Sequence, residues 1–147
     1  MRKLEHKIGN VFQIELEGGV YGYGRVLKIE ERTVFIELYK INTKTYSFKT
    51  IDEIVDLPVI LSIWSTDVGL KKIIWKVLGN VQITDEVVMP SFWKRDAINH
   101  DKYYIIKDDE TIEVTKEQIG DAQPYGIFGH DAVRLRYAHE LKLQGLM

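Results

Sequence analysis

Residues 7–39 read KIGNVFQIELEGGVYGYGRVLKIEERTVFIELY, and this stretch decides the fold class. Phe12, Ile14 and Leu16 alternate with polar residues, which is the period-two pattern of a half-buried strand. Two more strands are predicted over residues 20–29 and 33–39, because short turn sequences separate runs rich in aliphatic and aromatic residues. We therefore expect a three-stranded antiparallel meander, the usual start of a curled sheet or small barrel.

The second predicted strand contains two glycines, Gly22 and Gly24. Glycine weakens the interior of a strand, so a pair of them indicates strong curvature, a bulge or the close approach of another part of the chain. The sequence Gly-Tyr-Gly does not predict a phosphate-binding loop, because no helix is predicted directly after it.

The other face of this strand carries a mixed set of side chains, namely Tyr21, Tyr23, Arg25, Leu27 and Ile29. If this face is solvated, Tyr21, Tyr23 and Arg25 form a patch of the composition found at protein interfaces. If it is buried, the tyrosines belong to the core and Arg25 pairs with a carboxylate. The pattern leaves both interpretations open.

Further strands are predicted over residues 59–64, as a strand buried on both faces, and over residues 73–78. A hairpin is predicted with arms at residues 102–106 and 111–114, and its turn at residues 107–110 is rich in Asp and Glu. Residues 89–93, with Trp93-Lys94-Arg95 at their end, are expected to form a loop.

Three helices complete the expected fold. Capping-box sequences that start at Thr50 and Thr115 predict two short helices. A longer C-terminal helix is predicted over residues 131–143, with Asp131 as its N-cap and Val133, Tyr137 and Leu141 on one buried face. The predicted fold class is α+β and predominantly antiparallel β, a curled sheet or small partly open barrel with short helices and a C-terminal helix.

Length, composition and charge exclude several classes of protein. The 147 residues fit one domain over residues 1–147. There is no cysteine, which excludes disulfides, thiolate zinc sites and a cysteine nucleophile. No signal peptide or membrane span is predicted, so we expect a cytoplasmic protein. A net charge of −2 argues against a dedicated nucleic-acid binder.

The sequence offers no constellation of catalytic residues. The four histidines are scattered, and no zinc-binding or nucleophile-elbow motif is present. We therefore expect no enzyme activity, no metal site and no cofactor. Two alternatives stay open: a small-molecule hydrolase with an unrecognised site, and a small-barrel nucleic-acid-binding module that stacks bases on Tyr21 and Tyr23.

An interaction protein needs an exposed surface with aromatic and arginine anchors. The sequence offers two groups that fit this description, one on the second strand and one in the expected loop, and a third, acidic group in the hairpin turn. The candidate partner-binding residues are Tyr23, Arg25, Trp93, Lys94, Arg95, Asp108, Asp109 and Glu110.

Residues 7–16, KIGNVFQIEL, followed by Gly19 and by residues 21–27, YGYGRVL, resemble the opening of the Imm26 immunity proteins. In that bacterial family the segment looks like G-D-x-F-x-I-P-L, a glycine turn and Y-x-Y-G-R-V. The chain differs in having Asn10 in place of Asp and Glu15 in place of Pro. The resemblance is specific over about the first 30 residues, moderate to about residue 80 and thin beyond.

The resemblance implies a cytosolic, non-enzymatic protein that binds and neutralises the cognate toxin domain of a bacterial polymorphic toxin system. It implies no cofactor and names neither the toxin nor an oligomeric state. The motif residues themselves read as determinants of the fold, so recognition residues are expected elsewhere, on loops.

Overall fold

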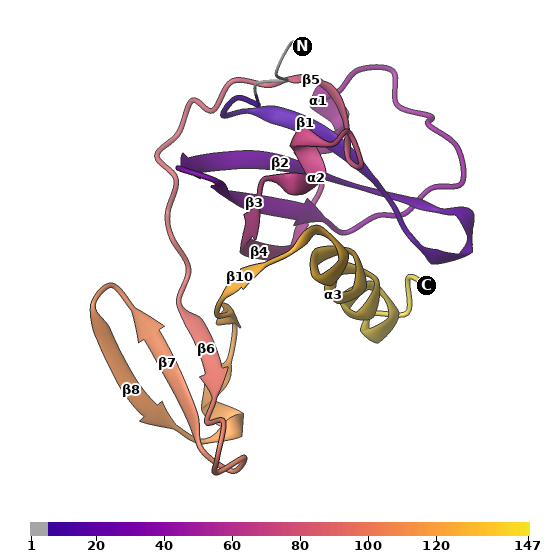
Figure 1. Cartoon of the computed structure of the whole chain (residues 1–147). Helices are drawn as coiled ribbons and strands as arrows, with labels where there is room; N and C mark the ends of the chain where they lie inside the picture. Colours follow the sequence, from indigo (N-terminus) through magenta and orange to yellow (C-terminus); the bar gives the residue numbers. More distant parts are fainter. Residues whose placement is uncertain (1–5) are drawn as a thin grey trace. The chain divides into compact units, whose positions relative to one another are not determined.

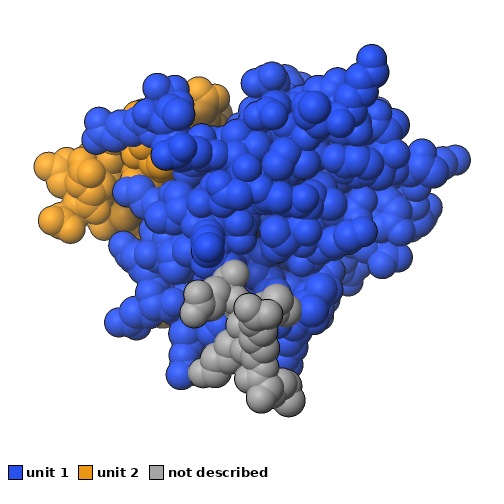
Figure 2. Space-filling view, turned by 90° about the horizontal axis from the view of Figure 1, so that it is seen from above, with its two compact units in different colours: residues 1–86, 127–147 blue, residues 87–126 orange. Residues whose placement is uncertain are grey.

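The computed structural model describes residues 6–147, and Figure 1 shows the order of their helices and strands. The chain divides into two compact units, coloured separately in Figure 2. The first unit comprises residues 1–86 and 127–147, and the second comprises residues 87–126. Each unit has its own sheet. That the chain forms a single immunity-protein-like domain stays a prediction.

The sheet of the first unit contains the predicted meander. Among the described residues its strand order is β10-β4-β3-β2-β1-β5, and the sheet does not close into a barrel. All neighbours are antiparallel except β10, which runs parallel to β4. The strands are β1 (Asn10–Glu15), β2 (Tyr21–Glu30), β3 (Thr33–Tyr39), β4 (Val59–Thr66), β5 (Lys76–Asn80) and β10 (Ile127–Phe128).

The helices of this unit are α1 (Asp52–Val55), α2 (Val68–Lys71) and α3 (His130–Leu143), with a 3-10 turn, η1 (Glu17–Gly19), between β1 and β2. In α1, Glu53 Oε2 accepts hydrogen bonds from the backbone N–H groups of Lys49 and Thr50, at 2.6 and 3.2 Å. This is the carboxylate half of the predicted capping box. The prediction of Asp131 as the N-cap of α3 is wrong, because the helix begins one residue earlier and Gly129 is the N-cap.

Two hydrophobic clusters lie on opposite faces of β1 and β2. The larger joins the sheet to α3 and to Trp75, whose ring stacks on Phe12 with the centroids 5.1 Å apart. It contains Val133, Tyr137 and Leu141, as the helical spacing predicted. The smaller cluster is built on Val11, Tyr23, Tyr39 and Ile54.

The predicted irregularity in β2 is present. Its pairing with β3 shifts between Val26 and Lys28. This bulge reverses the alternation, because one extra residue moves all later side chains to the opposite face. Ile29 therefore packs in the larger cluster with Val26, and its predicted placement on the face of Tyr23 is wrong.

The predictions for β4 and β5 need correction. In β4 only alternate residues, Leu61, Ile63 and Ser65, are buried, so the prediction of a strand buried on both faces is wrong. The fifth strand begins at Lys76, later than predicted, because residues 73–75 form the turn that carries the Trp75 side chain into the core.

The second unit is a small sheet with the order β8-β7-β6-β9. The predicted hairpin is confirmed, with Asp108 and Asp109 in its turn. Residues 92–95 form a strand that pairs with β7, so the prediction of a loop at Trp93-Lys94-Arg95 is wrong. The elements are β6 (Phe92–Arg95), β7 (Tyr103–Lys107), β8 (Glu110–Val114), the 3-10 helix η2 (Lys116–Ile119) and β9 (Gln123–Pro124).

Candidate protein-binding surfaces

Tyr23 lies in the core and is fully buried. Its hydroxyl shares a hydrogen bond of 2.8 Å with Thr43 Oγ1 and accepts a longer one, 3.3 Å, from Gln13 Nε2. The ring meets Phe48 edge to face, with the centroids 5.1 Å apart. The strand pattern left open whether Tyr23 faces solvent or the core, and the structure shows that it belongs to the core. Tyr23 has no exposed ring face on which a partner or a nucleic-acid base can stack.

Tyr137 of α3 forms hydrogen bonds that connect the helix to the backbone of the sheet at Tyr23 and Tyr39. Its hydroxyl donates to the carbonyl oxygen of Tyr39 at 2.5 Å and accepts from the backbone N–H of Tyr23 at 3.1 Å. Burial raises the pKa of Tyr137, so the hydroxyl stays protonated. Gly22 makes room for this ring, because a Cβ there would lie 2.4 Å from Tyr137 Cε2.

Arg25 is half-buried on β2, directly across from Glu37 of β3. The two side chains share one face of the sheet, because residues in register point the same way. Arg25 Nε is buried and has no hydrogen-bond partner among the described residues. Burial and the negative charge of Glu37 both raise the pKa of Tyr39, on the same face. Arg25 thus presents only part of its side chain to solvent.

Lys94, at the centre of β6, is held between aromatic rings of the second unit. Its Nζ lies 5.9 Å from the centroid of Tyr104 and 5.7 Å from that of Tyr125. Cation–π contacts of this kind attract the ammonium group to the ring faces. They give an exposed lysine a preferred position, which lowers the entropy that binding would cost.

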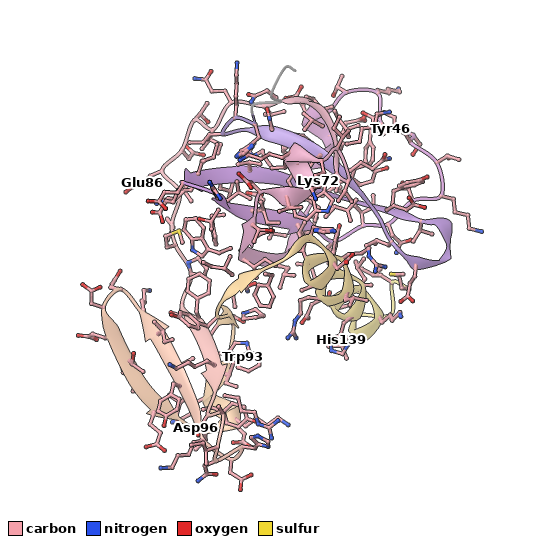
Figure 3. All side chains as sticks on the ribbon, viewed as in Figure 1. Tyr46, Lys72, Glu86, Trp93, Asp96 and His139 are labelled. Atoms are coloured by element: carbon pink, nitrogen blue, oxygen red, sulfur yellow. The ribbon has the colours of Figure 1, made fainter. Side chains whose placement is uncertain are left out.

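Arg95, the next residue, is ordered in a similar way. Its guanidinium carbon lies 5.6 Å from the centroid of Tyr103, and its Nε donates to the carbonyl oxygen of His100 at 2.6 Å. The ring of Trp93 packs against Tyr103 at 6.3 Å between centroids. Trp93, labelled in Figure 3, is half-buried. The ring of Tyr103 thus contacts both Trp93 and Arg95, two of the candidate partner-binding residues.

The loop that follows β6 is organised by Asp96. Its Oδ1 accepts hydrogen bonds from the backbone N–H groups of Ile98 and Asn99, at 2.9 and 2.8 Å. These bonds favour the ionised carboxylate and hold the pKa of Asp96 below its ordinary value. Asp96 was not among the candidate residues, although Asp is common in turns because its side chain bonds the backbone N–H groups that follow it.

The acidic residues Asp108, Asp109 and Glu110 are exposed at the tip of the β7–β8 hairpin. Asp108 has φ +53°, a left-handed conformation that Asp tolerates in turns. Within residues 6–147, no three His, Asp or Glu side chains are grouped so that they could hold a metal ion. The tip is therefore a small, negatively charged projection built on a turn.

A shallow hollow of about 640 Å³ adjoins Arg95 in the second unit. Its lining combines charges of both signs, with Arg95 and Lys116 on one hand and Asp101 and Glu113 on the other. Such a lining is suited to polar side chains of a partner and not to an apolar ligand.

The candidate residues thus fall in both units. Tyr23 and Arg25 belong to the first unit, whereas Trp93 to Arg95 and the hairpin tip belong to the second. A family model described as Immunity protein 26 matches residues 7–104 of the chain, from the start of the meander into β7. The chain belongs to the Imm26 family.

The Imm26 match covers the motif on which the resemblance was based and extends beyond it, whereas α3 lies outside it. Neither a curated protein nor a solved structure matches this Imm26 chain. Over residues 6–147, no helix has both the length and the apolar character that crossing a bilayer requires.

Proposed function

We propose that this Imm26 chain neutralises a toxin by binding the toxin domain in the bacterial cytoplasm, without catalysis and without a cofactor. The family match carries the proposal, because the family is one of immunity proteins. A stoichiometric inhibitor needs a surface complementary to its target and no reactive group.

The surface that we propose for binding lies mainly on the second unit. Trp93 and Arg95 are of the residue types that dominate binding energy at protein interfaces, and Lys94 and Arg95 are held in place by ring contacts. A standard interface buries about 800 Å² on each partner, which is more than these side chains provide. We therefore include the acidic hairpin tip of the same unit. Arg25, in the first unit, is a separate candidate contact through the exposed part of its side chain. Tyr23 has a structural role.

The test starts from the neighbouring genes, where we expect the toxin to be encoded. The C-terminal domain of the nearest large secreted protein is expressed alone and together with the chain, and growth is measured. Co-elution of the two purified proteins is then tested by size-exclusion chromatography. We expect toxicity, rescue by the chain and a stable one-to-one complex.

Three other outcomes would contradict the proposal. Rescue without a complex would indicate catalysis on the toxin or its product and would favour the hydrolase alternative. Toxicity without rescue would show that the chain gives no immunity to this toxin. Salt-sensitive binding to an oligonucleotide, in place of the toxin, would favour the nucleic-acid alternative.

A further inference from the structure

The strand β8 forms the outer edge of the second unit's sheet (Figure 1). It ends the strand order β8-β7-β6-β9, and β7 is its one neighbour among the described strands. Residues 110–113 are exposed, and Val114 is half-buried. An outer strand of this kind presents backbone N–H and C=O groups that can pair with a strand of another chain.

The backbone groups that point outwards belong to Thr111 and Glu113. The two-residue turn makes Lys107 and Glu110 a hydrogen-bonded pair, and such pairs alternate along an antiparallel ladder. Residues 110, 112 and 114 therefore direct their N–H and C=O groups to β7, whereas Thr111 and Glu113 direct theirs away from it. Within residues 6–147, neither makes a backbone hydrogen bond outside this ladder. The edge thus offers two donors and two acceptors to an extended peptide.

The other outer strands of the two described sheets are less suited to pairing. β9 and β10 are only two residues long, and the pairing of β5 with β1 contains a register shift. Short strands and bulges are the usual protection of a sheet edge. β8 has neither, because it pairs with β7 over five consecutive residues without a shift. It is therefore the edge at which strand addition is easiest.

The charge of the β7–β8 hairpin indicates which strand would be added. Glu110 and Glu113 lie on β8, Asp108 and Asp109 lie in the turn, and Lys107 is the one cation of residues 107–114. Glu110 and Glu113 point to opposite faces of the sheet. A strand added at the edge has neighbours on both faces, so both carboxylates can reach its side chains. The matching strand carries Lys or Arg on each face.

A second copy of this chain does not fit the edge well. Pairing of two β8 strands would bring four glutamates into one ladder, and like charges on neighbouring strands destabilise it. The same carboxylates attract a basic strand, so they select against one partner and in favour of the other. Ile112, in the middle of β8, is 55% exposed and supplies an apolar contact to the added strand.

We propose that β8 is extended by a basic strand of the toxin domain. The backbones of Thr111 and Glu113 form ladder hydrogen bonds with that strand, and the carboxylates of Glu110 and Glu113 pair with its Lys or Arg side chains. This inference rests on the proposed function, because it takes the partner to be the toxin domain.

Amide hydrogen exchange, followed by NMR on the full chain with and without the purified toxin domain, tests the hydrogen-bond pattern. In the free chain we expect slow exchange at Ile112, whose N–H bonds to β7, and fast exchange at Thr111 and Glu113. In the complex we expect exchange at Thr111 and Glu113 to slow by about tenfold or more. Docking through side chains alone would leave these two amides exchanging fast.

A proline variant tests the same edge by binding. Thr111→Pro removes an N–H that points away from β7, a position at which a sheet edge tolerates proline. We expect it to bind the toxin domain about tenfold or more weakly in surface plasmon resonance, while slow exchange at Ile112 shows that the hairpin is folded. Thr84→Pro is the matched control, because Thr84 is exposed and lies outside the helices and strands.

A charge reversal does not depend on the tolerance for proline. E110K/E113K and the control D85K/E86K change the net charge equally, and Asp85 and Glu86 are exposed residues of the first unit. We expect only E110K/E113K to bind about tenfold or more weakly, with slower association.

Three results would overturn strand addition. Binding of wild type without protection of Thr111 and Glu113, and with full affinity of E110K/E113K, would leave the proposed function standing. A dimer of the free chain that Thr111→Pro abolishes would assign the edge to a second copy. Failure of wild type to bind the toxin domain would overturn the proposed function as well.

Discussion

The hydroxyl of Tyr137 connects α3 to the backbones of both β2 and β3. Its loss in Tyr137→Phe leaves the N–H of Tyr23 and the carbonyl of Tyr39 without this partner in the core. A buried group without its hydrogen bond costs about 1–3 kcal/mol, so we expect the free energy of unfolding to fall by that amount. Urea denaturation followed by circular dichroism measures it.

Tyr125→Phe is the matched control for that change. Tyr125 is 53% exposed, and phenylalanine keeps the ring that Lys94 contacts. We expect this variant to unfold at the urea concentration of wild type. Equal midpoints for the two tyrosine variants would mean that the Tyr137 hydroxyl does not stabilise the fold.

We expect the stability of the loop after β6 to depend on the ionisation of Asp96, and therefore on pH. The N–H groups of Asn99 and Ile98 lower the pKa of Asp96 in the folded state. The ionised carboxylate therefore stabilises the loop at any pH above 3.8, the ordinary pKa of Asp. That contribution is lost as the pH falls through the lowered pKa. Titration of the Ile98 and Asn99 amide shifts by NMR should give a midpoint below 3.8. A midpoint at or above this value would contradict the assignment.

At the scale of the elements, the contributions of β6 and of the hairpin tip to toxin binding can be tested separately. Trp93→Ala removes a large ring that supports the β6 surface, and we expect it to weaken binding by about 2 kcal/mol or more. Because Trp93 also packs against Tyr103, circular dichroism must first show that the variant is folded. Calorimetric titration with the toxin domain then gives the change in affinity.

Asp109→Ala tests the hairpin tip without disturbing any packed ring. An exposed charge at an interface mainly affects the rate of association, so we expect slower association and a weaker dependence on salt. Asp85→Ala, in the first unit and also exposed, is the control. Unchanged affinity in both Trp93→Ala and Asp109→Ala, with intact folding, would show that the toxin binds elsewhere.

For the molecule as a whole, we propose that the 147 residues unfold as one domain. The second unit spans only residues 87–126, and of its hydrophobic residues Tyr103 is the buried one with a large side chain. Units below about 40 residues rarely hold a fold without further support. Hydrogen exchange along a urea series should show both units losing protection at the same concentration. Earlier loss in residues 87–126 would establish two independently unfolding parts.

The sequence by itself determined the strands of the meander, the hairpin and the buried face of α3. Each depends on a local pattern: alternation in β1, turn residues at Asp108 and Asp109, and the four-residue spacing of Val133, Tyr137 and Leu141. Residues 7–27, in the meander, also carried the resemblance to Imm26, and the family match confirms it.

The tertiary structure alone decided which faces are buried and which residues are brought together. Alternation fixes that Tyr23 and Arg25 share a face, but only packing of the 41–51 segment against it shows that Tyr23 is core. The bulge after Val26 reversed the side chains of β2. Gly22 and Gly24 indicated an irregularity in this strand, but the sequence did not fix its position, which depends on the pairing with β3. Trp93 to Arg95 became a strand because β7, eight or more residues away, offered a partner. The left-handed conformation of Ile73, with φ +58°, likewise follows from the burial of Trp75, since a conformation that local propensity opposes is held only by the contacts of the folded chain.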